Sequence, residues 1–112
     1  MPLHEPLPQP PAAEDIRLTD ILHALSDPGR VKMLMLLADG EYHPCGTETW
    51  GLAVQKSTIS HHLKTMREAG LIEYRLRGRN KDARLRRAIL DARFPGLIDG
   101  LTSEQAAADL EP

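Results

Sequence analysis

Apolar residues recur at helical intervals near the start of the chain. From about residue 18 the intervals are three and four residues, as in a helix with one buried face. Asp15 or Thr19 is expected to cap this helix, because their side-chain oxygens accept hydrogen bonds from free amides. The apolar positions of the predicted first helix are Leu18, Ile21, Leu22 and Leu25.

Boundary residues mark a second helix. Asp27 suits the N-cap, and Pro28 suits the first helical position, where the missing N–H of proline is not needed. Gly40 suits the position just after the last turn. The apolar stripe between these ends consists of Val31, Leu34, Met35 and Ala38.

The middle of the chain is predicted to hold an extended piece and two more helices. Residues 42–44 are expected to be extended, because the residue before Pro44 is disfavoured in a helix. A brief helix is predicted over residues 47–53. A longer one opens at Lys56 or Ser57 and ends before Gly70. The narrow apolar face of this longer helix consists of Ile59, Leu63 and Met66.

A hairpin and a last helix complete the predicted elements. Residues 71–77 and 83–89 partly alternate between apolar and polar side chains, and turn-forming residues 78–81 separate them. The last helix is predicted to begin between Asp91 and Pro95 and to run to about Leu110. Its apolar positions are Phe94, Leu97, Ile98 and Leu101. The predicted fold is therefore mainly α with a small β-hairpin (α+β), in the order of a winged helix-turn-helix.

The N-terminal segment differs from the rest of the chain in composition. Residues 1–13 contain five prolines and few residues to bury. We expect residues 1–14 to form a disordered arm, and residues 15–112 to form one domain. A domain of this size buries only about two-thirds of its unfolded surface, so added burial in a homodimer is expected.

Charge is segregated along the chain, although the formal net charge is only −2. Residues 1–55 hold 3 basic and 8 acidic side chains, and residues 88–112 hold 1 and 5. Residues 56–87 hold 10 basic and 3 acidic side chains. A charge run is usually only a solvated face, but segregation this sharp favours a polyanionic partner.

The predicted helix from residue 56 has the composition of a DNA-reading helix. Short hydrogen-bonding side chains can reach base edges in the major groove, and basic side chains behind them can contact phosphates. Solvated helices usually carry Glu and Lys instead. A helical wheel places His62 nearer the edge of the core than the other polar residues. The candidate DNA contacts on this helix are Lys56, Ser57, Thr58, Ser60, His61, His62, Lys64, Thr65 and Arg67.

The predicted hairpin is rich in basic residues. An arginine-bearing tip can reach the minor groove or neighbouring phosphates. The hairpin region carries Arg75, Arg77, Arg79, Lys81, Arg84, Arg86 and Arg87. Of these, Arg77, Arg79 and Lys81 are the predicted DNA contacts, and others are expected to be merely solvated.

Two stretches resemble the ArsR/SmtB family of transcriptional repressors. They are ALSDPGR at residues 24–30 and KSTISHHLKTMREAGLI at residues 56–72, within a similarity that covers about residues 16–101. The resemblance implies a winged-helix homodimer paired through its first and last helices. It also implies repression from a palindromic operator in double-stranded DNA, with release by an effector. In that family the stretch matching residues 57–64 enters the groove.

The metal ligands of that family are not matched. Its arsenic sensors carry Cys-x-Cys at the start of the third helix, and other members place Asp and His ligands along the last helix. This chain has His43-Pro44-Cys45 at the first place and no His after Phe94. We therefore predict no metal or other cofactor. A metal- or thiol-responsive sensor that uses His43 and Cys45 remains an alternative, and an ion there needs a third ligand.

Other classes of function explain the sequence less well. An enzyme is not predicted, because Cys45 with His43 or His61 is the only conceivable catalytic set and no oxyanion motif accompanies it. A protein-interaction module without DNA binding leaves the basic hairpin unexplained. An RNA-binding role lacks an aromatic stacking surface.

The predicted location is the cytoplasm. One cysteine, no signal-peptide pattern and no apolar run long enough for a bilayer favour a reducing compartment without a membrane. The operator sequence, the regulated genes, the effector and the direction of regulation stay open.

Overall fold

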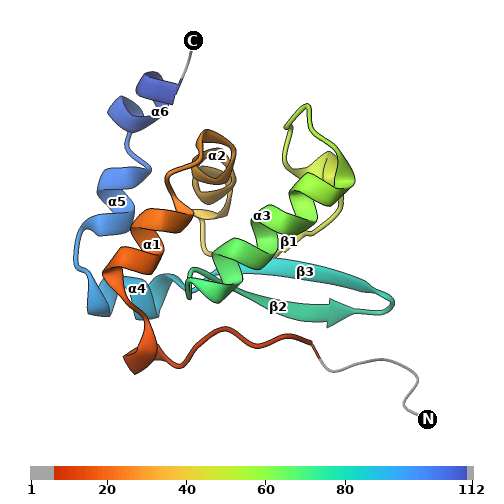
Figure 1. Ribbon diagram of the computed structural model, residues 1–112, viewed down its shortest axis with the longest axis horizontal. Coiled ribbons are helices and arrows are strands. Elements are labelled where there is room, and N and C mark those ends of the chain that lie inside the picture. The colour runs from red at the N-terminus through yellow and green to blue at the C-terminus, as the bar shows by residue number, and fades with distance from the viewer. Residues whose placement is uncertain (1–6, 111–112) are drawn as a thin grey trace.

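The computed structural model describes residues 7–110 and has six α-helices around a small sheet (Figure 1). The helices are α1 (Leu18–Ala24), α2 (Pro28–Leu37), α3 (Lys56–Glu68), α4 (Arg87–Arg93), α5 (Leu97–Leu101) and α6 (Glu104–Leu110). The strands are β1 (His43–Pro44), β2 (Ile72–Arg77) and β3 (Asn80–Leu85). Two 3₁₀ helices, η1 (Ala13–Asp15) and η2 (Thr47–Thr49), complete the order.

The start of α2 confirms its predicted cap, whereas the start of α1 does not. The Asp27 carboxylate accepts a hydrogen bond from the Arg30 amide at 3.1 Å. Arg17 occupies the N-cap of α1 without a side-chain hydrogen bond. The prediction that Asp15 or Thr19 caps α1 is therefore wrong.

The three strands form an antiparallel sheet in the order β1-β3-β2. Residues 43 and 44 are extended as predicted and pair with Ala83 and Asp82. The predicted hairpin is confirmed, with Arg75 opposite Asp82 and Tyr74 opposite Ala83. Its second strand ends at Leu85 instead of continuing to residue 89, because α4 begins at Arg87.

Two predicted helices are shorter in the structure. The helix predicted over residues 47–53 is reduced to η2, and Gly51 with φ +64° lies just beyond it. The single last helix is replaced by α4, α5 and α6. Pro95 and Gly96, with Gly96 at φ +83°, separate the first two, and Ser103 Oγ accepts from the Ala106 amide at the start of α6. The positive φ of Gly51 and of Gly96 interrupts the run of helical hydrogen bonds after η2 and between α4 and α5.

The core lies between the helices and the sheet. Ile59, Leu63 and Met66 of α3 are buried as predicted, together with Ile21 of α1 and Leu34 of α2. These helices and the β2–β3 hairpin have the order of a winged helix-turn-helix, which confirms the predicted fold class. The hairpin is the wing of the molecule.

The segment before η1 follows the body of the protein. Residues 7–12 form no helix or strand, and the backbone oxygens of Gln9 and Pro11 accept hydrogen bonds from Arg67 and Arg86. Residues 1–6 of the predicted arm lie outside the described residues. The disorder of residues 1–14 and the domain boundary stay predictions. No helix within residues 7–110 is long and apolar enough to span a bilayer.

Candidate nucleic-acid interface

The N-terminal half of α3 presents short polar side chains to solvent. Ile59 and Leu63 fix the helix to the core, and Ser57, Ser60 and His61 are exposed. Thr58 is half-buried beside them. The first turn contains no acidic residue, so its free amides keep their attraction for anions. This surface has the donors and acceptors that base reading needs.

The wing tip lies on the same side of the molecule as the start of α3. Figure 1 shows both directed away from α1, α4, α5 and α6. Lys56 and Lys64 are exposed on α3, and Arg79 is exposed in the turn of the wing. Within residues 7–110 these three cations make no ion pair. Their charges are available for phosphates.

Asp82 fixes two wing arginines. Its buried carboxylate accepts from Arg75 Nε at 3.1 Å and from Arg77 Nε at 3.2 Å. Burial acts to raise the pKa of Asp82, but the hydrogen bonds from Arg75 and Arg77 outweigh it and hold the pKa below its usual value. Arg77, a predicted DNA contact, is therefore oriented by the sheet. Arg75 is oriented with it, although the sequence did not single it out.

Aromatic rings support the other cations of the wing. Lys81 Nζ lies 4.2 Å from the centre of the Tyr74 ring. The guanidinium groups of Arg75 and Arg84 lie 4.1 and 4.7 Å from the centre of the Tyr42 ring. These contacts limit the freedom of the side chains, so their charges are presented from defined places.

Ion pairs and hydrogen bonds engage Arg84 and two further arginines of the basic block within the fold. Arg84 pairs with Glu73 on the neighbouring strand at 3.1 Å. Arg86 is buried and donates to the Pro11 carbonyl at 2.8 Å. Arg87 pairs with carboxylates of the C-terminal helices. Part of the excess positive charge of residues 56–87 is therefore paired or buried and is not free on the surface.

Three predicted contacts on α3 lie away from its exposed polar surface. His62 is only 7% exposed and faces α2. Thr65 lines a hollow between α3 and α1, and Arg67 donates to the Gln9 carbonyl at 3.0 Å. A helical wheel places His62 near the edge of the core, but nothing in the sequence identifies Arg30 as its hydrogen-bond partner.

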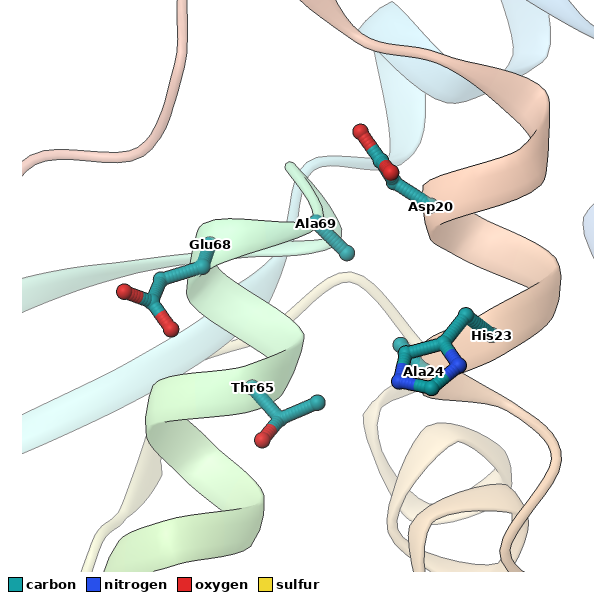
Figure 2. A pocket seen from close by; sticks show the side chains of 6 residues that line it. All are labelled: Asp20, His23, Ala24, Thr65, Glu68 and Ala69. Carbon is teal, nitrogen blue, oxygen red and sulfur yellow. The ribbon is translucent and has the colours of Figure 1, made fainter.

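The hollow beside Thr65 has a volume of about 360 Å³. Figure 2 shows the carboxylates of Asp20 and Glu68 pointing in different directions, and His23 on the α1 side. Both carboxylates and His23 are exposed. These side chains do not converge on one point.

His43 and Cys45 lie apart from any larger group of ligands. His43 Nε2 is 3.0 Å from the Asp39 carboxylate. Burial raises the pKa of the Cys45 thiol to about 11, with Asp82 adding to this shift and Lys81 opposing it. A thiol that stays protonated at neutral pH is a poor nucleophile. Among the described residues, no three His, Cys, Asp or Glu side chains are placed to hold a metal.

Comparisons with known proteins point to one family. The model of the arsR family of bacterial regulatory proteins matches residues 27–74. The uncharacterized HTH-type transcriptional regulator YceK of Bacillus subtilis (strain 168) is 33% identical over 90 residues, which cover 80% of this chain and 90% of that protein. The arsenical resistance operon repressor of Staphylococcus xylosus is 33% identical over 91 residues, covering 81% and 86%.

Solved structures agree with these sequence matches. A possible transcriptional regulator for arsenical resistance has a TM-score of 0.58 and 27% identity, and the match covers 81% of this chain and 93% of that one. An ArsR-like transcriptional regulator from Rhodococcus sp. RHA1 has a TM-score of 0.54 and 27% identity, covering 82% and 88%. The fold and the sequence are therefore similar to the same group of regulators.

Proposed function

Because the chain belongs to the arsR family of bacterial regulatory proteins, whose members regulate transcription by binding DNA, we propose that it is a repressor that reads its operator with α3. The observation that carries the proposal is the surface formed by Ser57, Ser60 and His61, with Lys56 and Arg79 on the same side. Relatives named as repressors support this direction of regulation.

The proposed interface divides base reading from phosphate binding. Ser57, Thr58, Ser60 and His61 read base edges in the major groove. Lys56 and Lys64 bind phosphates beside that groove. Arg77, Arg79 and Lys81 contact phosphates or the minor groove through the wing. Thr65, Arg67 and the buried His62 lie away from the exposed polar surface of α3, so we assign them no direct base contact.

The proposed repressor is a homodimer on a palindromic operator. Leu18 and Leu22, one helical turn apart on α1, are 43% and 49% exposed. Leucines exposed this far on one face of a helix favour burial against a second copy. The first helix and the C-terminal helices α5 and α6 are the proposed contact surfaces. A two-fold dimer places two α3 helices on two half-sites of the operator.

Regulation is proposed to act through binding and without catalysis. A regulator of chromosomal DNA acts in the cytoplasm, and an effector that has not been identified releases it from the operator. The lack of a third ligand beside His43 and Cys45 among the described residues and the raised pKa of Cys45 favour an effector other than a metal or an oxidant at that place.

Substitution of the reading residues tests this proposal. We expect Thr58→Ala and His61→Ala each to cost about 1–3 kcal/mol on the operator, with little effect on scrambled DNA, because only base contacts are lost. Affinity is measured on a duplex selected from a random DNA library and on its scrambled version. Equal losses on both duplexes would contradict reading by α3.

Substitution of Arg79 is expected to affect operator and scrambled DNA alike, unlike substitution of the reading residues. Its charge is exposed at the wing tip, so Arg79→Ala is expected to weaken binding to both duplexes. The slope of log affinity against log salt is expected to fall by about one unit, because one phosphate contact is lost. Arg84→Ala is the matched control, since Arg84 is already paired with Glu73. An unchanged slope for the Arg79 variant would remove the wing tip from the interface.

A further inference from the structure

A partly buried contact joins α3 to both helices that precede it. Arg30 Nη1 donates a hydrogen bond to His62 Nδ1 at 3.0 Å. Arg30 Nε also donates to the carbonyl of Ala24, the last residue of α1. Arg30 lies on α2 and His62 in the middle of α3. One guanidinium group therefore connects the end of α1, the start of α2 and the DNA-reading helix.

The Arg30 contact determines which ring nitrogen of His62 carries the proton. A guanidinium group only donates hydrogen bonds, so Nδ1 of His62 accepts and carries no hydrogen. The neutral ring then has its proton on Nε2, which faces the Asp27 carboxylate at 3.7 Å. A proton on Nδ1 sets two donors against each other and breaks the contact.

The close approach of α3 to α2 depends on a glycine. A Cβ at Gly29 would lie 3.3 Å from His62 Nε2 and 3.0 Å from Asp27 Oδ2. A side chain at position 29 would therefore crowd both the Asp27 carboxylate and the ring of His62.

From this geometry we propose that His62 is a positioning residue, which holds α3 in its reading position only while its ring is neutral and accepts from Arg30. The proposal rests on the proposed function and adds a dependence on pH to it. Acidification protonates Nδ1, separates His62 from Arg30 and moves the exposed side chains of α3 out of register with the bases. Contacts with phosphates depend less on register, so selectivity is lost before general affinity.

The charged groups around His62 favour a neutral ring at neutral pH. Burial lowers the pKa of His62, Asp27 acts to raise it, and Arg30 and His61 lower it further. The net shift is downward. Because the folded-state pKa lies below the unfolded value of about 6.5, this contribution to stability is complete above that pH and is lost as the pH falls further.

Binding measured from pH 7.5 to 5.5 tests the inference. The readout is the ratio of affinities for a library-selected duplex and its scrambled version, because general attraction to phosphates cancels from this ratio and base reading does not. We expect the wild-type ratio to fall about tenfold, which is a typical loss for one misread base pair. Circular dichroism at each pH confirms that the protein stays folded.

Variants separate His62 from its neighbour. His62→Gln keeps an acceptor for Arg30 without a titrating group, so we expect the ratio at pH 7.5 to be retained and its pH dependence to disappear. His62→Leu removes the acceptor and is expected to lower the ratio at every pH. His61→Gln, the matched control, is expected to keep the wild-type fall with pH.

Nitrogen-15 NMR of the free protein reports the ring directly. We expect His62 Nδ1 to be unprotonated at pH 7.5. A protonated Nδ1, a wild-type ratio that does not change down to pH 5.5, or a fall in the ratio that persists in His62→Gln would overturn the inference and leave the proposed function intact. Absence of any selectivity in the wild type at pH 7.5 would overturn the proposed function, and this inference with it.

Discussion

Replacing both exposed leucines of α1 with glutamate is expected to convert the proposed dimer into a monomer. Leu18 and Leu22 are 43% and 49% exposed, so the change removes no core contact within one chain. In a two-fold interface the new charges repel each other and cannot be solvated. Operator affinity is expected to fall on the order of 100-fold or more, since the second half-site no longer binds intramolecularly. Sedimentation at micromolar concentration and operator titration measure the two effects.

A control leucine on another surface makes this result specific. Leu36 of α2 is 38% exposed, and Leu36→Glu is expected to leave both the oligomeric state and operator affinity unchanged. Thermal unfolding shows whether each variant is folded. A folded double variant that remains a dimer would exclude α1 from the interface. Loss of the dimer in Leu36→Glu would move the interface to α2.

Substitution of Gly70 is expected to have the largest effect on stability. Gly70 follows the last turn of α3 at φ +90°, and a Cβ there would lie 2.7 Å from Ile16 Cγ1. Left-handed backbone geometry and overpacking against Ile16 therefore act together. We expect Gly70→Ala to lower the free energy of unfolding by about 3 kcal/mol. Chemical denaturation of the variant measures this loss.

Gly78 is the matched control for the backbone contribution. It has φ +62° in the turn of the wing, and no atom lies within 4 Å of a Cβ built there. Gly78→Ala is expected to cost about 1 kcal/mol, from backbone strain alone. Ile16→Ala is expected to reduce the effect of Gly70→Ala, because it removes the overlapping atoms. Equal losses at both glycines would exclude a steric contribution from Ile16.

Local signals in the sequence account for the elements that carry the proposed interface. The period of Ile59, Leu63 and Met66 identifies the buried face of α3, and Gly70 marks its end. The Asp27-Pro28 pair marks the start of α2. Each of these signals acts over only a few residues, so it can be read without the fold. The family resemblance and the DNA-binding role follow from the same residues.

Some departures from the predicted elements also have local causes. Pro95 and Gly96 divide the C-terminal helical region, and Gly51 lies where the helix predicted over residues 47–53 fails. The apolar positions at 94, 97, 98 and 101 predicted one continuous helix across the break at Pro95 and Gly96. Glycine in the left-handed region ends a helix whatever the apolar period on either side of it.

The roles of individual charges depend on contacts between distant residues. The strand register places Asp82 opposite Arg75, and the Asp82 carboxylate also pairs with Arg77. Arg86 is buried and donates to the Pro11 carbonyl in the segment before η1. His62 meets Arg30, which lies 32 residues earlier in the chain. Helical period and composition predict which face is polar, because they depend on neighbours in sequence. Which polar groups are neutralised, buried or left for DNA depends on packing, since ion pairs and hydrogen bonds form between whichever groups the fold brings within about 3 Å of each other.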